Sequence, residues 1–317
     1  MKLEKRKIVI IGCGHVGVST AFCLINQGLC DEIALIDLNE EKVLGEVLDL
    51  SQSIEYMNRN THVKVGRYED CEDAQIVIIT ASVPTPQSGN DRLKMLEPSL
   101  NVMKSIITQI KEHHFDGHLI VVSNPVDLMS YYAYKLSGLP ANQVIGTGTT
   151  LDTARLKYFI AQKIQVDPRS VHAMVIGEHG DSEMIPWSTV RIGGKDIYSV
   201  VQDNQSRLGQ EPYQQMKKDT IQAGWEIFNR KGNTCYGIAS STVGIIRTIL
   251  HNENQILPVS TLLRGEYDQD DLFISVPAII DRSGVREIVE LRMTPQEQEE
   301  FNQSCQRLKS FYDLLNQ

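Results

Sequence analysis

The feature that most constrains this chain is a glycine motif set between a strand pattern and a helix pattern. Residues 7–11 form a short apolar, β-branched run, and the sequence GCGHVG at 12–17 follows at once. A helical pattern over 18–27 and a second apolar run over 33–36 come next, and that run ends in Asp37. A strand, a tight glycine turn, a helix and an acidic residue about twenty positions later form the signature of dinucleotide binding.

Each part of this motif has a physical role. Gly12 makes the turn, Gly14 lets the backbone approach a pyrophosphate, and Gly17 allows the helix to pack on the strand. The helix N-terminus offers N–H donors to the phosphates. Asp37 can accept hydrogen bonds from a ribose diol and would repel a 2′-phosphate, so the motif favours NAD over NADP. The alternative interpretation is a tight turn that binds no ligand.

The alternation of strand and helix patterns predicts a doubly wound parallel sheet, the Rossmann arrangement. Composition and helix signals change near Gly146, so we expect an NAD-binding domain over 1–146 and an α+β substrate domain over 147–317. Further strands are expected over 62–65, 74–80, 118–122, 171–176, 255–263 and 272–280, and helices over 40–56, 92–114, 212–230 and 236–250 and from a capping Thr294 onward.

Composition and charge exclude several classes of function. The chain has 317 residues, a net charge of -9 and a pI of about 5.4, which argues against non-specific binding to nucleic acid or anionic membrane. Its six cysteines form no C-x-x-C pair, so reduced cysteines in the cytoplasm are expected. The sequence shows no apolar run long enough for a membrane span, and we expect no metal site.

Several polar residues are candidates for a site at the ends of the strands. His179 lies between two glycines, which suits either a solvated surface turn or a side chain that reaches a ligand. Asp152 and Arg155 share a helix face, either as a surface ion pair or with separate partners. Arg92 begins a helix, where the dipole disfavours a cation, and it follows a loop over 81–91 that is either a closing lid or a plain connection. Asn124 precedes a proline.

These side chains match the needs of a nicotinamide-dependent reaction on a 2-oxo or 2-hydroxy acid. His179 can give or take the hydroxyl proton, and Asp152 can orient it. Arg155 can clamp the substrate carboxylate as a planar fork, and Arg92 can polarise the carbonyl as water leaves.

The chain resembles the NAD-dependent L-lactate/malate dehydrogenase family, in particular its L-lactate and L-2-hydroxyisocaproate branch. The resemblance covers nearly the whole chain and is carried by GCGHVG at 12–17, SNPVD at 123–127, GTGTTLDTAR at 146–155, IGEHGDSEMIPWS at 176–188, KGNTCYGIA at 231–239 and VPAIIDRSG at 276–284. It implies a cytoplasmic L-lactate dehydrogenase of glycolysis or fermentation that is active as a homotetramer or dimer. It also implies that the catalytic side chains are His179, Asp152, Arg155 and Arg92. It also implies that Asn124 and Thr234 contact the substrate and that NAD is contacted near Val16, Asp37, Lys42, Tyr68, Ser82, Val83, Ser105, Val122, Asn124 and Thr147.

The lid departs from the family pattern. Lactate enzymes carry A-P-Q-K-P-G-E-T-R, whereas residues 83–92 here are one position longer, and the position that selects the substrate falls on Thr85, Pro86 or Gln87. No cation precedes Arg92 in the lid, which argues against oxaloacetate, and the longer lid leaves room for a bulkier 2-oxo acid. L-2-Hydroxyisocaproate dehydrogenase is therefore the first alternative function, and malate dehydrogenase is the second.

Other implications of the resemblance are weaker. In enzymes activated by fructose 1,6-bisphosphate, an arginine and a histidine bind the phosphates, and Lys157 and His172 stand at those positions. Lysine binds phosphate as a point charge rather than as a fork. Two rivals lie outside this class: an NAD-binding protein without catalysis, and an NAD-dependent glycosidase, which would need a metal site.

Overall fold

A nine-stranded sheet forms the centre of the molecule. The computed structural model describes residues 5–83 and 92–315, with side chains over 5–83 and 96–312. The strand order is β12-β11-β10-β6-β5-β4-β1-β2-β3. The strands are β1 (Lys7–Ile11), β2 (Glu32–Ile36), β3 (His62–Val65), β4 (Ile76–Ile79), β5 (His118–Val121), β6 (Val144–Gly146), β10 (Gln255–Arg264), β11 (Asp270–Asp281) and β12 (Gly284–Ile288).

Strands β3, β2, β1, β4, β5 and β6 lie side by side in this order, and all six are parallel. This is the 3-2-1-4-5-6 order of dinucleotide-binding sheets. The predicted doubly wound sheet is therefore confirmed. The strands predicted over 255–263 and 272–280 are β10 and β11, which pair antiparallel, and β10 also pairs with β6 through Ser260 and Gly146. The sheet thus continues from the first half of the chain into the second.

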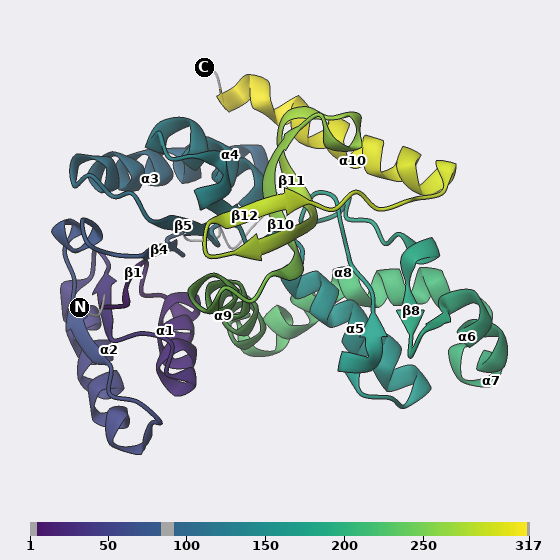
Figure 1. The fold of residues 1–317 in the computed structure, drawn as a ribbon, viewed down its shortest axis with the longest axis horizontal. Coiled ribbons are helices and arrows are strands. Elements are labelled where there is room, and N and C mark those ends of the chain that lie inside the picture. The colour runs from purple at the N-terminus through teal and green to yellow at the C-terminus, as the bar shows by residue number, and fades with distance from the viewer. Residues whose placement is uncertain (1–4, 84–91, 316–317) are drawn as a thin grey trace.

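Helices cover both faces of this sheet, because side chains of successive strand residues point to opposite faces. Ile8 and Ile10 of β1 belong to one apolar core, with α1 (His15–Gln27), α2 (Glu40–Ser53) and α9 (Tyr236–His251). Val9 and Ile11 belong to the other, with α3 (Arg92–Glu112), α4 (Val126–Ser137) and α10 (Pro295–Leu315). Figure 1 shows the two helix layers on either side of the strands.

The remaining elements form a third apolar core beside the sheet. They are α5 (Thr150–Ile164), α6 (Ile197–Asp203), α7 (Gln205–Leu208), α8 (Pro212–Lys231) and a small sheet of β7 (Val171–His172), β8 (Arg191–Ile192) and β9 (Lys195–Asp196). The strand predicted over 171–176 is only partly correct. β7 ends at His172, and the chain then makes single bridges from Ile176 to Met184 and from Gly177 to Ser275. Gly177, with φ at 95°, turns the backbone out of the extended conformation.

Local signals placed most helix ends correctly. The capping box at α10 is present, because the Thr294 amide donates to Glu297 Oε2 at 2.9 Å and the Glu297 amide donates to Thr294 Oγ1 at 3.3 Å. Helix α1 begins at His15, three residues before the predicted start. Helix α4 was not predicted at all. In the described residues, no helix combines the length and apolar character needed to cross a membrane.

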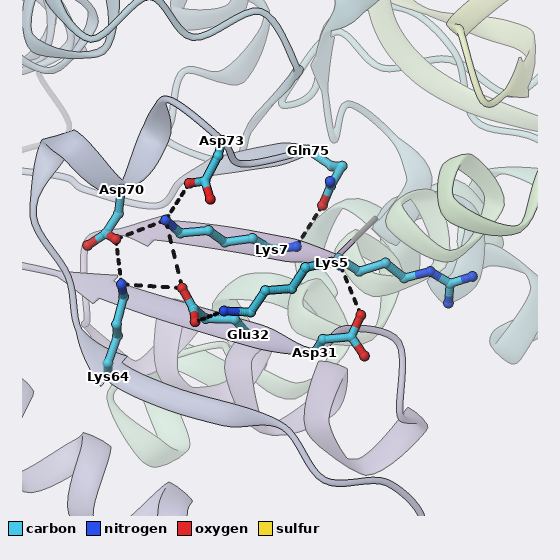
Figure 2. Close-up of polar contacts among 9 residues, drawn as sticks. Lys5, Lys7, Asp31, Glu32, Lys64, Asp70, Asp73 and Gln75 are labelled. Carbon is cyan, nitrogen blue, oxygen red and sulfur yellow. Dashed lines mark hydrogen bonds and ion pairs between the residues drawn. The ribbon is translucent and has the colours of Figure 1, made fainter. Parts of the chain in front are cut away.

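A charge network lies at the beginning of β1 and β2, where these strands start rather than end (Figure 2). The buried Lys7 ammonium lies 2.9 Å from Asp70 Oδ1 and 2.6 Å from Asp73 Oδ1. Lys64 lies 2.6 Å from the same Asp70 oxygen and 3.3 Å from the buried Glu32. Each buried charge therefore has a partner of opposite sign, which offsets the cost of removing it from water.

Candidate active site

The glycine turn after β1 is built for close approach. Gly12 has φ at 103°, and a Cβ there would lie 2.4 Å from the Ala81 amide nitrogen. A Cβ on Gly17 would lie 2.0 Å from the Gly12 carbonyl oxygen, so both residues must lack a side chain. Gly14 differs, because nothing lies within 4 Å of its Cβ position. This open space at the start of α1 fits the pyrophosphate of a dinucleotide.

Asp37 lies beside this turn, at the carboxyl end of β2. One of its carboxylate oxygens accepts the Cys13 amide at 2.7 Å, and the other accepts the Asn39 amide at 3.1 Å. The Lys42 ammonium donates to the Cys13 carbonyl oxygen at 2.7 Å. The carboxylate and the glycine turn are thus held together, as a ribose diol bound next to a pyrophosphate requires.

The other candidate cofactor residues fall into two groups. Val16 is in the first turn of α1, and Ser82, Val83, Val122 and Thr147 follow β4, β5 and β6 at their carboxyl ends. Tyr68 likewise follows the carboxyl end of β3 and is half-buried in a short 3₁₀ helix (Tyr68–Cys71). Ser105 differs, because it is exposed on α3 and follows no strand end. All of these candidates except Ser105 therefore lie close to the carboxyl edge of the sheet.

His179, Asp152 and Arg155 form one connected cluster. His179 Nδ1 lies 2.6 Å from Asp152 Oδ2, and Arg155 Nη1 donates to the other Asp152 oxygen at 2.9 Å. The Asp152 side chain is 3% exposed, so the interpretation of Asp152 and Arg155 as a surface ion pair is wrong. Asp152 has both partners at once. The His179 ring is 24% exposed and is not a solvated surface turn.

Backbone contacts bring this cluster to the sheet. Helix α5 directly follows β6, and the Thr149 hydroxyl donates to the Val175 carbonyl at 2.5 Å. The His179 amide donates at 2.8 Å to Asp127, in the first turn of α4 and just after β5. The histidine is therefore held at the carboxyl end of β5, at the same edge of the sheet as the glycine turn.

The electrostatics of the cluster favour a protonated histidine. Burial alone would lower the pKa of His179, but the charge of Asp152 and its hydrogen bond raise it to about 9. Burial would likewise raise the pKa of Asp152, whereas the nearby His179 and Arg155 lower it. At neutral pH the cluster therefore holds an imidazolium beside a carboxylate, with Nε2 as the ring nitrogen that Asp152 leaves free.

Two carboxyl groups of the cluster were missed by sequence reasoning. Asp127 is fully buried, and burial raises its pKa to about 6 despite the amide of His179. Glu183 is also buried, and it offers an oxygen within 4.8 Å of one atom each from Asp152 and His179. Both lie in motifs that the family resemblance already marked. The signal for Asp127 was an acidic residue at the end of its motif with apolar residues after it, whereas Glu183 follows Asp181 and Ser182 within its motif and had no such signal.

A cavity of about 430 Å³ opens beside Arg155 and Thr234. Its walls come from α5, α8 and α9, and the lining includes Leu151, Phe159 and Ile238. Lys231 and Glu226 also line this cavity, whereas His179 does not. The apolar side chains next to Arg155 suit a molecule with a carboxylate and a short hydrocarbon part. The structure thus brings Thr234, from the loop before α9, to Arg155 of α5.

Three further candidates are placed only in part. Asn124 is exposed just after β5, at the cofactor edge of the sheet. Arg92 is the first residue of α3, but its side chain lies outside the described residues. Gln87 and the rest of the predicted lid from 84 to 91 also lie outside them.

The two candidate phosphate residues lie on neighbouring elements, Lys157 on α5 and His172 on β7. His172 is exposed, and burial lowers the pKa of Lys157. Within the described part of the chain, Lys157 has no ion-pair partner.

Comparison with known proteins agrees with this architecture. The lactate/malate dehydrogenase NAD binding domain matches residues 6–146, and the alpha/beta C-terminal domain of the same family matches residues 149–315. The chain is 46% identical to L-lactate dehydrogenase 3 of Bacillus thuringiensis subsp. konkukian, over 99% of both chains. It is 45% identical to an L-lactate dehydrogenase of Lactococcus lactis subsp. cremoris, over 99% of this chain and 100% of the relative.

Solved structures give the same result. The minor L-lactate dehydrogenase from Enterococcus mundtii, in its ligand-bound form, is 45% identical with a TM-score of 0.94, covering 98% of this chain and 99% of its own. A lactate dehydrogenase from a Medee basin deep-sea metagenome library is 39% identical with a TM-score of 0.95, covering 99% and 100%. Fold and matches together define an NAD-dependent oxidoreductase. More particularly, the chain belongs to the lactate/malate dehydrogenase family.

Proposed function

We propose that the protein is an L-lactate dehydrogenase, which reduces pyruvate with NADH and a proton to L-lactate and NAD. The observation that carries this proposal is the His179–Asp152–Arg155 cluster, held at the cofactor edge of the sheet through Asp127. It provides an acid and a carboxylate clamp at the same edge of the sheet as the turn proposed to accept the dinucleotide. The names of the relatives favour lactate over other 2-hydroxy acids.

His179 is the proposed acid. Asp152 accepts the Nδ1 proton, which fixes the ring and leaves Nε2 to give its proton to the substrate oxygen. Because the pKa of His179 is raised to about 9, the proton is present at neutral pH, as reduction of a ketone requires. In the reverse direction, neutral His179 takes the hydroxyl proton.

Arg155 is the proposed clamp for the substrate carboxylate. Only Nη1 is engaged by Asp152, so that contact fixes one edge of the guanidinium and leaves its other donors for the substrate. Thr234 would line the pocket for the substrate methyl group, and Asn124 would contact the substrate oxygen from the end of β5. Arg92 and Gln87 are proposed as lid residues on the family resemblance alone.

NAD would be held by the glycine turn, Asp37 and the residues at the carboxyl strand ends, and when bound it supplies or accepts the hydride. Gly14 leaves room for the pyrophosphate, and Asp37 would accept the adenosine ribose hydroxyls. We assign residues 1–146 to cofactor binding and 147–317 to substrate binding. All six cysteines are free thiols, which supports a cytoplasmic location.

We also propose that Lys157 and His172 bind an anion. The observation that favours it is a partly buried ammonium on α5 without an ion-pair partner among the described residues, next to an exposed imidazole. A phosphate group would supply that partner. Fructose 1,6-bisphosphate is the ligand that the family resemblance suggests.

We also propose that the enzyme is a homo-oligomer. Large apolar side chains are exposed on two surfaces, Leu44 and Leu48 on α2 and Trp225 and Phe228 on α8. Leu48 is 53% exposed and Trp225 51%, which favours burial against another copy. Leu48→Glu is expected to lower the mass measured by light scattering, whereas Leu48→Met should preserve it. An unchanged mass for the Glu variant would exclude α2 from the interface.

The test of the proposed function is NADH oxidation against pyruvate, 2-oxoisocaproate and oxaloacetate, with and without fructose 1,6-bisphosphate. We expect kcat/KM for pyruvate to exceed the other two by at least about tenfold. A preference for 2-oxoisocaproate would instead make the protein a general L-2-hydroxy acid dehydrogenase with an enlarged pocket. Activity should survive dialysis against EDTA, and its loss would favour the metal-dependent glycosidase class.

A further inference from the structure

Glu183 lies four residues after His179 in the same loop, and its carboxyl group is turned into the acid–base cluster. The residue is 3% exposed. One carboxylate oxygen of Glu183 lies within 4.8 Å of both a ring nitrogen of His179 and a carboxylate oxygen of Asp152. The loop is closed by two backbone bonds of 2.8 and 2.9 Å between Ile176 and Met184, so the residue next to Glu183 is fixed. The contact therefore belongs to the folded site.

This carboxyl lacks what an ionised group needs. Its Oε1 atom is buried and receives no hydrogen bond from the residues that the structure describes. A carboxylate without donors is costly in such surroundings, and a neutral acid is favoured. Burial and then the charge of Asp152 raise the pKa of Glu183 to about 8, although His179, Arg155 and Lys217 act in the opposite direction.

We propose that Glu183 is a positioning residue of the acid–base centre, a buried neutral carboxyl whose proton is coupled to the proton on His179. The coupling follows from distance, because a charge on Glu183 and a charge on the imidazole interact through a dry region. When Glu183 loses its proton at high pH, its negative charge holds the proton on His179 more tightly. Pyruvate reduction then keeps its acid over a wider pH range.

The charged groups that act on Glu183 come from α5, from its own loop and from α8, and α4 contributes a group that acts on His179. Asp152 and Arg155 face it from α5, and His179 faces it from its own loop. Lys217 acts from α8, where it also pairs with Glu300 at 3.2 Å, and Asp127 of α4 acts on His179. A substrate carboxylate on Arg155 would add negative charge, which favours the protonated form of both groups. The inference rests on the proposed function, since it assumes that His179 is the acid.

The first test compares Glu183→Gln with the wild type, because glutamine has the shape of the neutral acid but cannot ionise. The ring nitrogens of His179 are followed by NMR in protein with ¹⁵N-labelled histidine, with His179→Gln identifying the signal. We expect the midpoint of the His179 titration to fall by about one pH unit in Glu183→Gln. The alkaline limb of kcat/KM for pyruvate should move by the same amount, with KM at neutral pH unchanged. An unmoved His179 titration in a folded variant would overturn the proposal.

A second measurement uses the wild-type protein and so does not depend on whether a variant of Glu183 folds. The infrared carbonyl band of a neutral carboxylic acid should be present in the wild type at pH 7 and should vanish as the pH rises to 10. Absence of that band at pH 7 would overturn the proposal. Glu178→Gln is the matched control, because Glu178 is a buried glutamate of the same loop with Arg307 at 3.3 Å, and the variant should keep the band.

The NMR titration of His179 and the infrared band of Glu183 are both measured without turnover. If the titrations of Glu183 and His179 are coupled but the protein does not reduce pyruvate, the role of Glu183 stands and the proposed substrate is wrong. Reduction of pyruvate with an uncoupled titration would refute only the role of Glu183.

Discussion

Asp152 Oδ2 lies 2.6 Å from Nδ1 of His179, although 27 positions separate the two residues in the chain. The buried carboxylate both orients the imidazole and favours its charged form. The same carboxylate accepts a hydrogen bond from Arg155. One side chain thus connects the proposed acid, His179, to the proposed substrate clamp, Arg155.

The first prediction concerns Asp152→Asn. Loss of the carboxylate removes the group that raises the pKa of His179 most, while burial still lowers it, so the imidazole loses its proton at a lower pH. Reduction needs the protonated ring and should therefore lose its alkaline range first. We expect kcat/KM for pyruvate at pH 7.5 to fall by about 10² to 10⁴, measured over pH 5.5 to 10. An alkaline limb at the wild-type position would contradict this role of Asp152.

The second prediction concerns the carboxylate clamp. Arg155→Leu removes the fork and should raise KM for every 2-oxo acid by about 100-fold or more, while NADH binding is retained. Arg155→Lys is the matched variant, because it keeps the charge but cannot bind the carboxylate bidentately. Its KM should lie between those of the wild type and Arg155→Leu. If Arg155→Leu bound pyruvate as the wild type does, the clamp would have to be another residue.

The third prediction uses two glycines of the same turn. Gly17→Ala would place a Cβ 2.0 Å from the Gly12 carbonyl oxygen, so the variant should be destabilised and should not bind NADH. Gly14→Ala has free space and an extended backbone, with φ at -73°, so it should cost at most about 1 kcal/mol of stability.

Gly14→Ala, unlike Gly17→Ala, is expected to change the affinity for NADH without a large change in stability. Gly14→Ala should still weaken NADH binding, because the added methyl group occupies the space proposed for the pyrophosphate. Thermal melting and NADH fluorescence titration measure the two effects separately. Full NADH affinity in a folded Gly14→Ala variant would place the pyrophosphate elsewhere.

Features determined by residues close together in the sequence could be predicted from it, whereas contacts between distant residues needed further information. The glycine turn, Asp37 and the capping box at Thr294 were predictable because short motifs determine them. The pairing of Asp152 with His179 followed from chemistry and family resemblance, since nothing local connects them.

Other features depended on the tertiary structure. The strand expected over 171–176 stops early because only Val171 and His172 pair with β8, while Ile176 and Gly177 make single bridges to Met184 and to Ser275 of β11. Asp127 and Glu183 were not identified because their partners lie far away in the sequence or in an irregular loop, and folding alone brings them together.

The fourth prediction concerns stability in acid. Burial would raise the pKa of Asp70, but hydrogen bonds from Lys64, the Arg67 amide and Lys7 lower it to about 2. Figure 2 shows the contacts of Asp70 with Lys64 and Lys7. A lowered pKa means that this stabilisation is complete above the unfolded pKa of about 4 and is lost as the pH falls toward 2. Asp70→Asn should therefore cost on the order of 1–2 kcal/mol at pH 7, after allowance for solvent screening, and much less near pH 2.

The matched control for this network is Asp73→Asn. Its side chain is 73% exposed, compared with 16% for Asp70, so its loss should have little effect on the free energy of unfolding. Urea unfolding at pH 7 and at low pH measures both variants. Equal losses for the two, or a loss for Asp70→Asn that did not depend on pH, would contradict the account of this network.

The central claim is that His179 supplies the proton for NADH-dependent reduction of pyruvate. The most direct measurement is turnover of pyruvate by His179→Gln, with NADH affinity determined by fluorescence in the same preparation. We predict that kcat falls by about 10² to 10⁴ while NADH binds as in the wild type. A variant that binds NADH and reduces pyruvate at close to the wild-type rate would contradict the assignment of His179 as the acid.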